Sequence, residues 1–281
     1  MATLLHGPAG TLRNGWKAAL FVLVAWACNG TAFAVRDSLP RLALAPPAWF
    51  SCLAFLAATW FCLQGEGRPL ASVGLRLDRR WACQWLAGTL AGAGLMGLMV
   101  LGGLLAGGFH LAPNPEASLA GLAAGAWLYL GVACSEELLF RGYLFQRLES
   151  GLGAGPALGL LGLLFAALHW GNPGMAGLTR AWASLNIALA GILLGLCYLR
   201  TRSLALPIGL HLGWNWTQGS LLGFGVSGIH HPGWWTPVWH GRPAWVVGGS
   251  FGLEASLICT VVCAAACFGL ARWAPEIRPD V

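Results

Sequence analysis

Charged residues are scarce in this sequence. They make up 9% of the 281 residues, whereas hydrophobic residues make up 57%, and the mean hydropathy is +0.66. A soluble domain carries roughly 25% charged residues, so the composition excludes an ordinary water-soluble domain. Most of the protein surface must face lipid, and we predict an integral membrane protein with the lipid bilayer as a partner.

Several sequence patterns are also absent. None of the nine cysteines forms a CxxC pair, so we expect neither a disulfide framework nor a cysteine metal site. There is no HExxH motif, and no internal repeat of the kind that builds a transporter from two equivalent halves. The formal net charge of +6 comes mostly from arginines scattered at the ends of apolar segments, which argues against nucleic acid as a partner.

Apolar runs that can cross a bilayer, each of about 20 helical residues, account for most of the chain. No segment alternates polar and apolar residues as a strand would, so we predict an all-α, polytopic helical membrane protein with about eight transmembrane helices. Residues 1–281 would form a single transmembrane domain, and glycine-rich runs such as LAGTLAGAG (86–94) favour close helix packing. The expected spans lie near 16–35, 43–63, 84–107, 120–146, 156–171, 183–199, 204–222 and 247–271.

Arginine and lysine are distributed unevenly between the two sides of this bundle. With both termini in the cytoplasm, eleven basic residues fall in cytoplasmic segments and four in outer segments, as the positive-inside rule requires. A compact chain rich in glycine, alanine and tryptophan, with one lysine, indicates a bacterial inner (plasma) membrane protein. Residues Thr31–Ala34 resemble a signal-peptide cleavage site, but the long basic region before them favours an uncleaved first helix.

Polar residues inside the predicted spans form three short motifs. Residues four apart share one face of a helix, so Glu137 can pair with Arg141, and His211 lies beside Asn215. Glu136 points about 100° away from Glu137, which leaves Glu136 free to face a cavity. Ionisable groups inside a membrane are functional candidates. The motifs are SEELLFRG (135–142), LLFAALHWGNPG (163–174) with His169, and LPIGLHLGWNW (206–216).

The depths of these residues predict a common site. At 1.5 Å per residue, Glu136, His169 and His211 lie about 15, 20 and 10–12 Å from the cytoplasmic ends of their spans, so we expect one site that is open to the cytoplasm. A buried glutamate with a histidine can activate water, and a histidine with an asparagine can stabilise an oxyanion, which together support peptide hydrolysis. Glu136, His169 and His211 are also zinc-type ligands, so metal-free and zinc-assisted hydrolysis both stay open. Glu254 and Asn186 are interpreted as packing residues, Asn186 as an interhelical hydrogen-bonding residue.

The three motifs, in this order, resemble those of the CPBP family, the CAAX prenyl endopeptidase and bacteriocin-processing intramembrane proteases, also called the Abi family. The matching patterns are Glu136-Glu137-x-x-x-Arg141, Phe165-x-x-x-His169 and His211-x-x-x-Asn215. The resemblance extends over residues 118–222, in spans four to seven, and predicts a catalytic core there.

The resemblance also implies roles for individual residues. Glu136 and His169 would activate the attacking water, and His211 and Asn215 would stabilise the oxyanion. Glu137 and Arg141 would support them. Descriptions of the family include both metal-dependent and glutamate-type mechanisms, and we favour the glutamate type, without a cofactor, over one that uses a divalent metal such as zinc.

The resemblance implies an intramembrane peptidase whose partner is a membrane-embedded or lipid-linked protein or peptide substrate. It does not name that substrate, and we assign no prenyl group to it. The alternative is a non-proteolytic membrane scaffold or immunity factor with the same fold. A scaffold has no need for the complete set of Glu136, His169, His211 and Asn215, so the sequence favours the peptidase.

Overall fold

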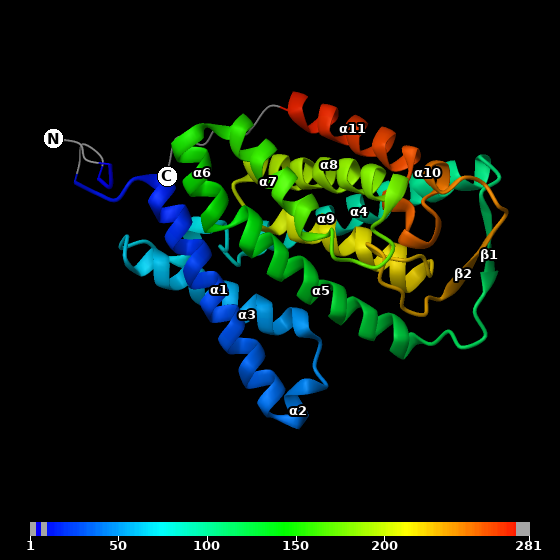
Figure 1. Ribbon diagram of the computed structural model, residues 1–281, viewed down its shortest axis with the longest axis horizontal. Helices are drawn as coiled ribbons and strands as arrows, with labels where there is room; N and C mark the ends of the chain where they lie inside the picture. Colours follow the sequence, from blue (N-terminus) through cyan, green and yellow to red (C-terminus); the bar gives the residue numbers. More distant parts are fainter. Residues whose placement is uncertain (1–3, 7–9, 274–281) are drawn as a thin grey trace.

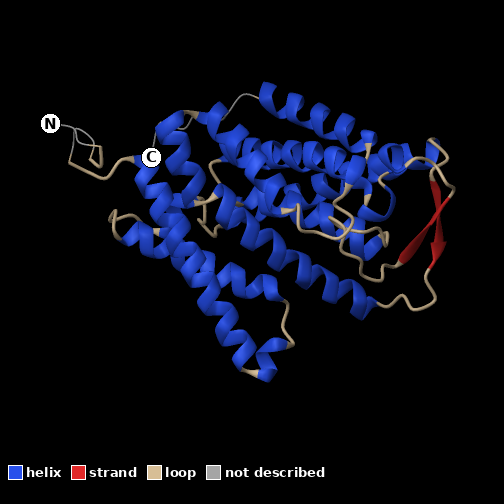
Figure 2. Ribbon diagram, in the orientation of Figure 1, coloured by secondary structure: helices blue, strands red, loops and turns tan. Residues whose placement is uncertain are grey.

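The computed structural model describes residues 4–6 and 10–273 of the chain. These residues form a bundle of helices with a small two-stranded ribbon at one end (Figure 1). Figure 2 shows how far helix dominates over strand in the bundle, so the predicted all-α polytopic class is confirmed. The longer helices are α1 (Asn14–Ser38), α3 (Pro47–Gln64), α4 (Arg79–Leu105), α5 (Leu119–Arg141), α6 (Tyr143–Leu152), α7 (Ala154–Leu168), α8 (Gly177–Thr201), α9 (Ala205–Trp216) and α11 (Leu257–Arg272).

Each of the eight predicted spans contains a helix. Among the described residues, five helical segments are long and apolar enough to cross a membrane: α1, α3, α4, α8, and α5 together with α6. The chain bends between α5 and α6 at Gly142, where a side chain would meet the carbonyl of Leu138. The remaining three, α7, α11 and α9 with its π-helical extension η2 (Thr217–Leu221), are shorter. Their status as full spans stays a prediction.

The last predicted span, 247–271, begins ten residues before the helix that it contains. Residues 244–255 form three short turns, α10 (Ala244–Val247), η3 (Gly249–Phe251) and η4 (Leu253–Ala255), and the helix α11 starts only at Leu257. Gly248, Gly249 and Gly252 have φ angles of +94°, +59° and +117°, which a right-handed helix does not allow. Ser256 then caps α11 by accepting a hydrogen bond from the backbone N–H of Cys259.

The ribbon was not predicted from the sequence. Strand β1 (Phe109–Pro113) pairs antiparallel with β2 (Trp235–Trp239), with Phe109 opposite Trp239. The rings of Phe109, Trp239 and Phe224 meet edge to face, with centroids 4.9 to 5.7 Å apart. Polar–apolar alternation did not reveal these two short strands, because aromatic packing at the end of the bundle stabilises them instead.

Glycines on both helices allow α4 and α9 to pack with their backbones in contact. A Cβ atom on Gly88 or Gly92 would overlap carbonyl oxygens of α9, and a Cβ atom on Gly209 or Gly213 would overlap carbonyl oxygens of α4. The reciprocal glycines bring the two backbones into direct contact. Because residues two apart lie on nearly opposite faces of a helix, this contact turns His211, midway between Gly209 and Gly213, away from α4.

We expect the substitution Gly92→Ala to destabilise the protein by roughly 1–3 kcal/mol, because overpacking forces the two backbones apart. Gly94→Ala is the matched control on the same helix, since a Cβ atom at Gly94 meets nothing within 4 Å. Thermal unfolding of the purified protein in detergent measures both. Equal melting temperatures for the two variants would contradict the close α4–α9 contact.

Glu66, in the turn after α3, connects three helices near the end of the bundle where α1 begins. Its carboxylate lies 3.1 Å from the Lys17 ammonium of α1 and 3.2 Å from the Arg147 guanidinium of α6, and it accepts a 2.6 Å hydrogen bond from the Tyr143 hydroxyl. Burial alone would raise the pKa of Glu66, but the bonds from Tyr143 and Lys17 and the charge of Arg147 outweigh it and lower the pKa below its usual value.

The lowered pKa of Glu66 predicts a pH-dependent contribution to stability. The carboxylate stabilises the fold above its unfolded-state pKa of about 4.3, and this stability is lost as the pH falls through the lower folded-state value. Glu66→Gln should therefore lower the melting temperature at pH 7, and the difference from wild type should close in acid. Glu116→Gln, at an exposed carboxylate, is the control; a pH-independent difference at Glu66 would contradict the prediction.

Candidate active site

Glu137 and Arg141 form a buried ion pair that supports the site. Both lie on α5, where Glu137 is 0% and Arg141 2% exposed, and the predicted ion pair is present, with Arg141 Nη1 donating to Glu137 Oε1 over 3.0 Å. The second guanidinium nitrogen, Nη2, donates to the carbonyl of Gly191 on α8 over 2.8 Å. The guanidinium also lies over the ring of Phe165 on α7, 4.9 Å from its centroid. Arg141 therefore connects α5, α7 and α8 while neutralising Glu137.

His211, on α9, is bonded to the carboxylate of this ion pair. Its Nδ1 atom lies 2.9 Å from Glu137 Oε1, and because a carboxylate accepts, Nδ1 carries the hydrogen. The other ring nitrogen, Nε2, points toward Glu136, with 3.7 Å between Nε2 and Glu136 Oε2. Glu137 thus orients the ring, so that Nε2 is the atom of His211 that is left for other contacts.

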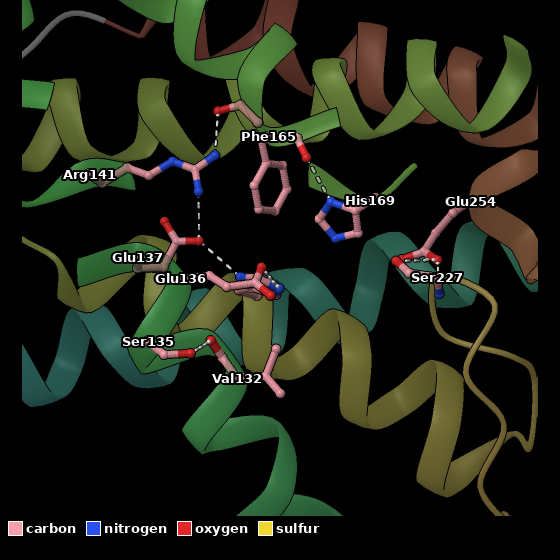
Figure 3. A network of polar contacts seen from close by, with 11 residues as sticks. Val132, Ser135, Glu136, Glu137, Arg141, Phe165, His169, Ser227 and Glu254 are labelled. Atoms are coloured by element: carbon pink, nitrogen blue, oxygen red, sulfur yellow. Dashed lines mark hydrogen bonds and ion pairs between the residues drawn. The ribbon is translucent and has the colours of Figure 1, made fainter. Parts of the chain in front are cut away.

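Glu136 has a different environment from its neighbour Glu137. Its side chain is 29% exposed and lines a cavity of about 380 Å³, and it makes no hydrogen bond within the described residues. The predicted division between the two carboxylates is therefore present: one is buried and paired, and the other faces open space. Figure 3 shows both with Arg141 above them.

His169 approaches the same cavity from the end of α7. Its Nδ1 atom donates to the carbonyl of Phe165 over 2.7 Å, which leaves Nε2 without a hydrogen-bonding partner in the described chain. The Phe165 ring meets His169 and His211 edge to face, with centroids 4.8 and 6.4 Å away. The Phe165 ring thus separates the two histidines, and the Arg141 guanidinium lies over the same ring.

Asn215 completes the predicted set. It lies one turn after His211, is 5% exposed and lines the cavity, and its amide makes no hydrogen bond to any described residue. Amides buried in a protein usually have partners. An unpaired amide beside His211 is therefore available to a ligand. All four residues predicted to be catalytic, Glu136, His169, His211 and Asn215, line the one cavity.

The cavity runs along α5 from Glu136 to Tyr129 and reaches the exposed residues Ile229 and His231, at the end of the bundle away from Arg147. The exposed side chain of Leu168 also lines it. Which side of the membrane these residues face depends on the orientation of the chain, so the expected opening toward the cytoplasm stays a prediction.

Sequence reasoning missed part of the cavity wall. Asn172, Ser227 and Glu254 also line it, and Glu254 is 92% buried, at 8% exposure. Glu254 was interpreted as a packing residue because it lies near the end of a predicted span. The sequence signal that could have identified it as a cavity residue was its ionisable side chain in an apolar segment. The interpretation of Asn186 is confirmed: it donates to the carbonyls of Glu254 and Ser256 and accepts from Thr260 of α11.

The alternative set of zinc ligands predicted from the sequence was Glu136, His169 and His211. No three His, Cys, Asp or Glu side chains within residues 4–6 and 10–273 converge at metal-binding spacing. The Nδ1 atoms of His211 and His169 are bonded to Glu137 and to a carbonyl, which leaves Nε2 of each ring free, as in histidines that bind metals. All three residues line one cavity, and zinc-assisted hydrolysis stays open beside the metal-free route.

Comparison with known families supports the resemblance seen in the motifs. Residues 118–217, a little over a third of the chain, match the family model described as Type II CAAX prenyl endopeptidase Rce1-like. The match includes all seven motif residues from Glu136 to Asn215 and confirms the resemblance to the CPBP family over this region. No curated protein and no solved structure shows a significant match to the chain.

Arg141→Ala would leave the Glu137 carboxylate buried without its cation. Breaking a buried ion pair in this way costs roughly 3–5 kcal/mol, so we expect a large fall in melting temperature and in the yield of folded protein. Arg76→Ala, at an exposed arginine, is the matched control. Wild-type stability of Arg141→Ala would contradict the structural role of the pair.

Proposed function

We propose that this integral membrane protein, whose residues 118–217 match type II CAAX prenyl endopeptidases, is an intramembrane endopeptidase. It would hydrolyse a peptide bond of a membrane-embedded or lipid-linked protein or peptide. The observation that carries the proposal is the arrangement of Glu136, His169, His211 and Asn215 around one cavity. In a scaffold, the unpaired amide of Asn215 and the free nitrogen of His169 would serve no packing role.

The proposed reaction begins with a water molecule between Glu136 and His169. Glu136 takes a proton from the water, assisted by Nε2 of His169, and the oxygen attacks the carbonyl carbon of the scissile bond. The C–N bond then breaks as the proton passes to the leaving amine, and the products are a carboxylic acid and an amine. Atoms and electrons balance without an oxidant, a reductant or a cofactor.

The tetrahedral intermediate carries an oxyanion, which needs hydrogen-bond donors. The Asn215 amide supplies N–H groups that have no other partner. His211 can donate from Nε2 when both of its nitrogens carry hydrogen, and the carboxylates of Glu136 and Glu137 both face its ring. Glu137 and Arg141 support the site by holding His211, without touching the substrate.

The cavity suits an apolar substrate segment, because apolar and aromatic side chains, with leucine the most frequent, make up most of its wall. We place the protein in a bacterial inner membrane with both termini in the cytoplasm, from the distribution of arginine. In that orientation the exposed residues Ile229 and His231 face the outer side. Glu136, about 15 Å from the cytoplasmic end of its span, then places cleavage near the centre of the bilayer.

Glu136→Ala and His169→Ala should each lower cleavage about 100- to 10,000-fold, the range over which a general acid or base contributes. Both should melt like the wild type, since neither side chain bonds another side chain at close range. Comparative proteomics of membrane peptides from cells with wild type or Glu136→Ala would identify the substrate. If every peptide level is the same with both proteins, the peptidase proposal fails.

A metal-free, glutamate-type mechanism predicts resistance to chelators. Incubation of the purified protein with EDTA or 1,10-phenanthroline should leave cleavage of the identified peptide unchanged, because no step uses a metal. Loss of activity that zinc restores would contradict the mechanism and favour zinc-assisted hydrolysis. Glu136→Ala serves as the inactive reference in the same assay.

A further inference from the structure

Glu254 is a buried carboxylate that the mechanism above does not use. It lies in the turn η4, faces the same cavity as Glu136 and His169, and is only 8% exposed. A buried carboxylate is costly unless it is hydrogen-bonded. Its contacts therefore show what the side chain does at this position.

One oxygen of Glu254 accepts two hydrogen bonds from a single residue. Oε2 accepts from the backbone N–H of Ser227 and, over 3.2 Å, from the Ser227 hydroxyl. Ser227 has φ +48°, a left-handed conformation that non-glycine residues seldom adopt. The carboxylate thus stabilises an otherwise unfavourable turn in the loop that forms one side of the cavity mouth.

Ser227 is bonded on its other side to the segment that follows His169. The Asn172 side chain donates to the Ser227 carbonyl over 2.9 Å, and the Asn172 backbone N–H donates to the His169 carbonyl over 3.0 Å. A continuous path of hydrogen bonds therefore runs from Glu254 through Ser227 and Asn172 to the backbone of His169. Figure 3 shows Glu254 and Ser227 beside His169, on the side away from Glu137.

The backbone of Glu254 is itself well fixed. Its carbonyl accepts a 2.7 Å hydrogen bond from Asn186, which anchors the turn to α8. The neighbouring Gly228 N–H donates to the carbonyl of Phe251 in η3 over 2.8 Å. The path to His169 therefore starts from a rigid support, as a group that must hold a catalytic side chain in place requires.

From these contacts we propose that Glu254 is a positioning residue of the active site. Its carboxylate, through Ser227 and Asn172, holds the turn that carries His169 and so places Nε2 of that ring in the cavity. The proposal rests on the proposed function for its effect on catalysis. Its effect on the geometry of His169 is independent of any activity.

The first experiment needs no substrate. Diethyl pyrocarbonate modifies free imidazole nitrogens, and mass spectrometry of the full-length protein in detergent gives the rate at each histidine. Glu254→Ala and Asn172→Ala should each change the rate at His169 severalfold and leave the rate at His110, an exposed residue of β1 outside the cavity, unchanged. Glu116→Ala, at an exposed carboxylate outside the cavity, is the control. An unchanged rate at His169 in both variants would overturn the proposal.

The second experiment uses the peptide identified with Glu136→Ala. Glu254→Ala and Asn172→Ala should each lower kcat about 10- to 100-fold, as small displacements of a catalytic group do, with KM within about twofold of wild type. Glu254→Gln should recover most of kcat, because its amide oxygen can still accept from Ser227. The double variant Glu254→Ala/Asn172→Ala should be no slower than the slower single variant, since both interrupt one path.

Three results would overturn the positioning role: wild-type kcat in folded Glu254→Ala, losses that multiply in the double variant, or a Glu254→Gln variant as slow as Glu254→Ala. If Glu254→Ala does not fold, the role is overturned by wild-type kcat in Asn172→Ala or by a Glu254→Gln variant as slow as Asn172→Ala. A protein in which no peptide depends on Glu136 would refute the peptidase function. The diethyl pyrocarbonate result would then still decide whether Glu254 positions His169.

Discussion

The fully buried Glu137 carboxylate fixes the positions of the other groups in the site. One of its oxygens accepts from both Arg141 and His211, so a single atom joins helix α5 to α9 and, through Arg141, to α8. A buried carboxylate is tolerated only when it is paired and hydrogen-bonded. The pairing is therefore structural, and it leaves the adjacent Glu136 as the carboxylate that faces open space.

The packing of the helices serves the same arrangement. The glycines of α4 and α9 bring those backbones together and turn His211 and Asn215 toward α5. Phe165 separates His169 from His211 and lies against Arg141. Groups from three helices are thus held at fixed positions around the cavity before any substrate binds, which is the preorganisation that hydrolysis of a peptide bond requires.

Much of this arrangement could be predicted from the sequence, because helical spacing is a local property. The i, i+4 relation gave the Glu137–Arg141 pair, and the shared depth of the motifs predicted that they meet. The extent of the cavity and the contacts of Glu254 with Ser227 could not be predicted, because they depend on how side chains from distant segments fill the bundle. The turns at Gly248 and Gly252 were missed because an apolar run that contains glycine is also compatible with a helix. The ribbon was missed because it depends on aromatic contacts between segments more than a hundred residues apart.

Two neighbouring carboxylates with separate roles should respond differently to the same substitution, so the pair of variants Glu136→Gln and Glu137→Gln separates those roles. Melting temperature and cleavage rate would be measured for both in the same detergent. We expect Glu136→Gln to melt like the wild type but not to cleave, and Glu137→Gln to melt at a lower temperature. An active Glu136→Gln, or a Glu137→Gln as stable as the wild type, would show that the two roles are not divided in this way.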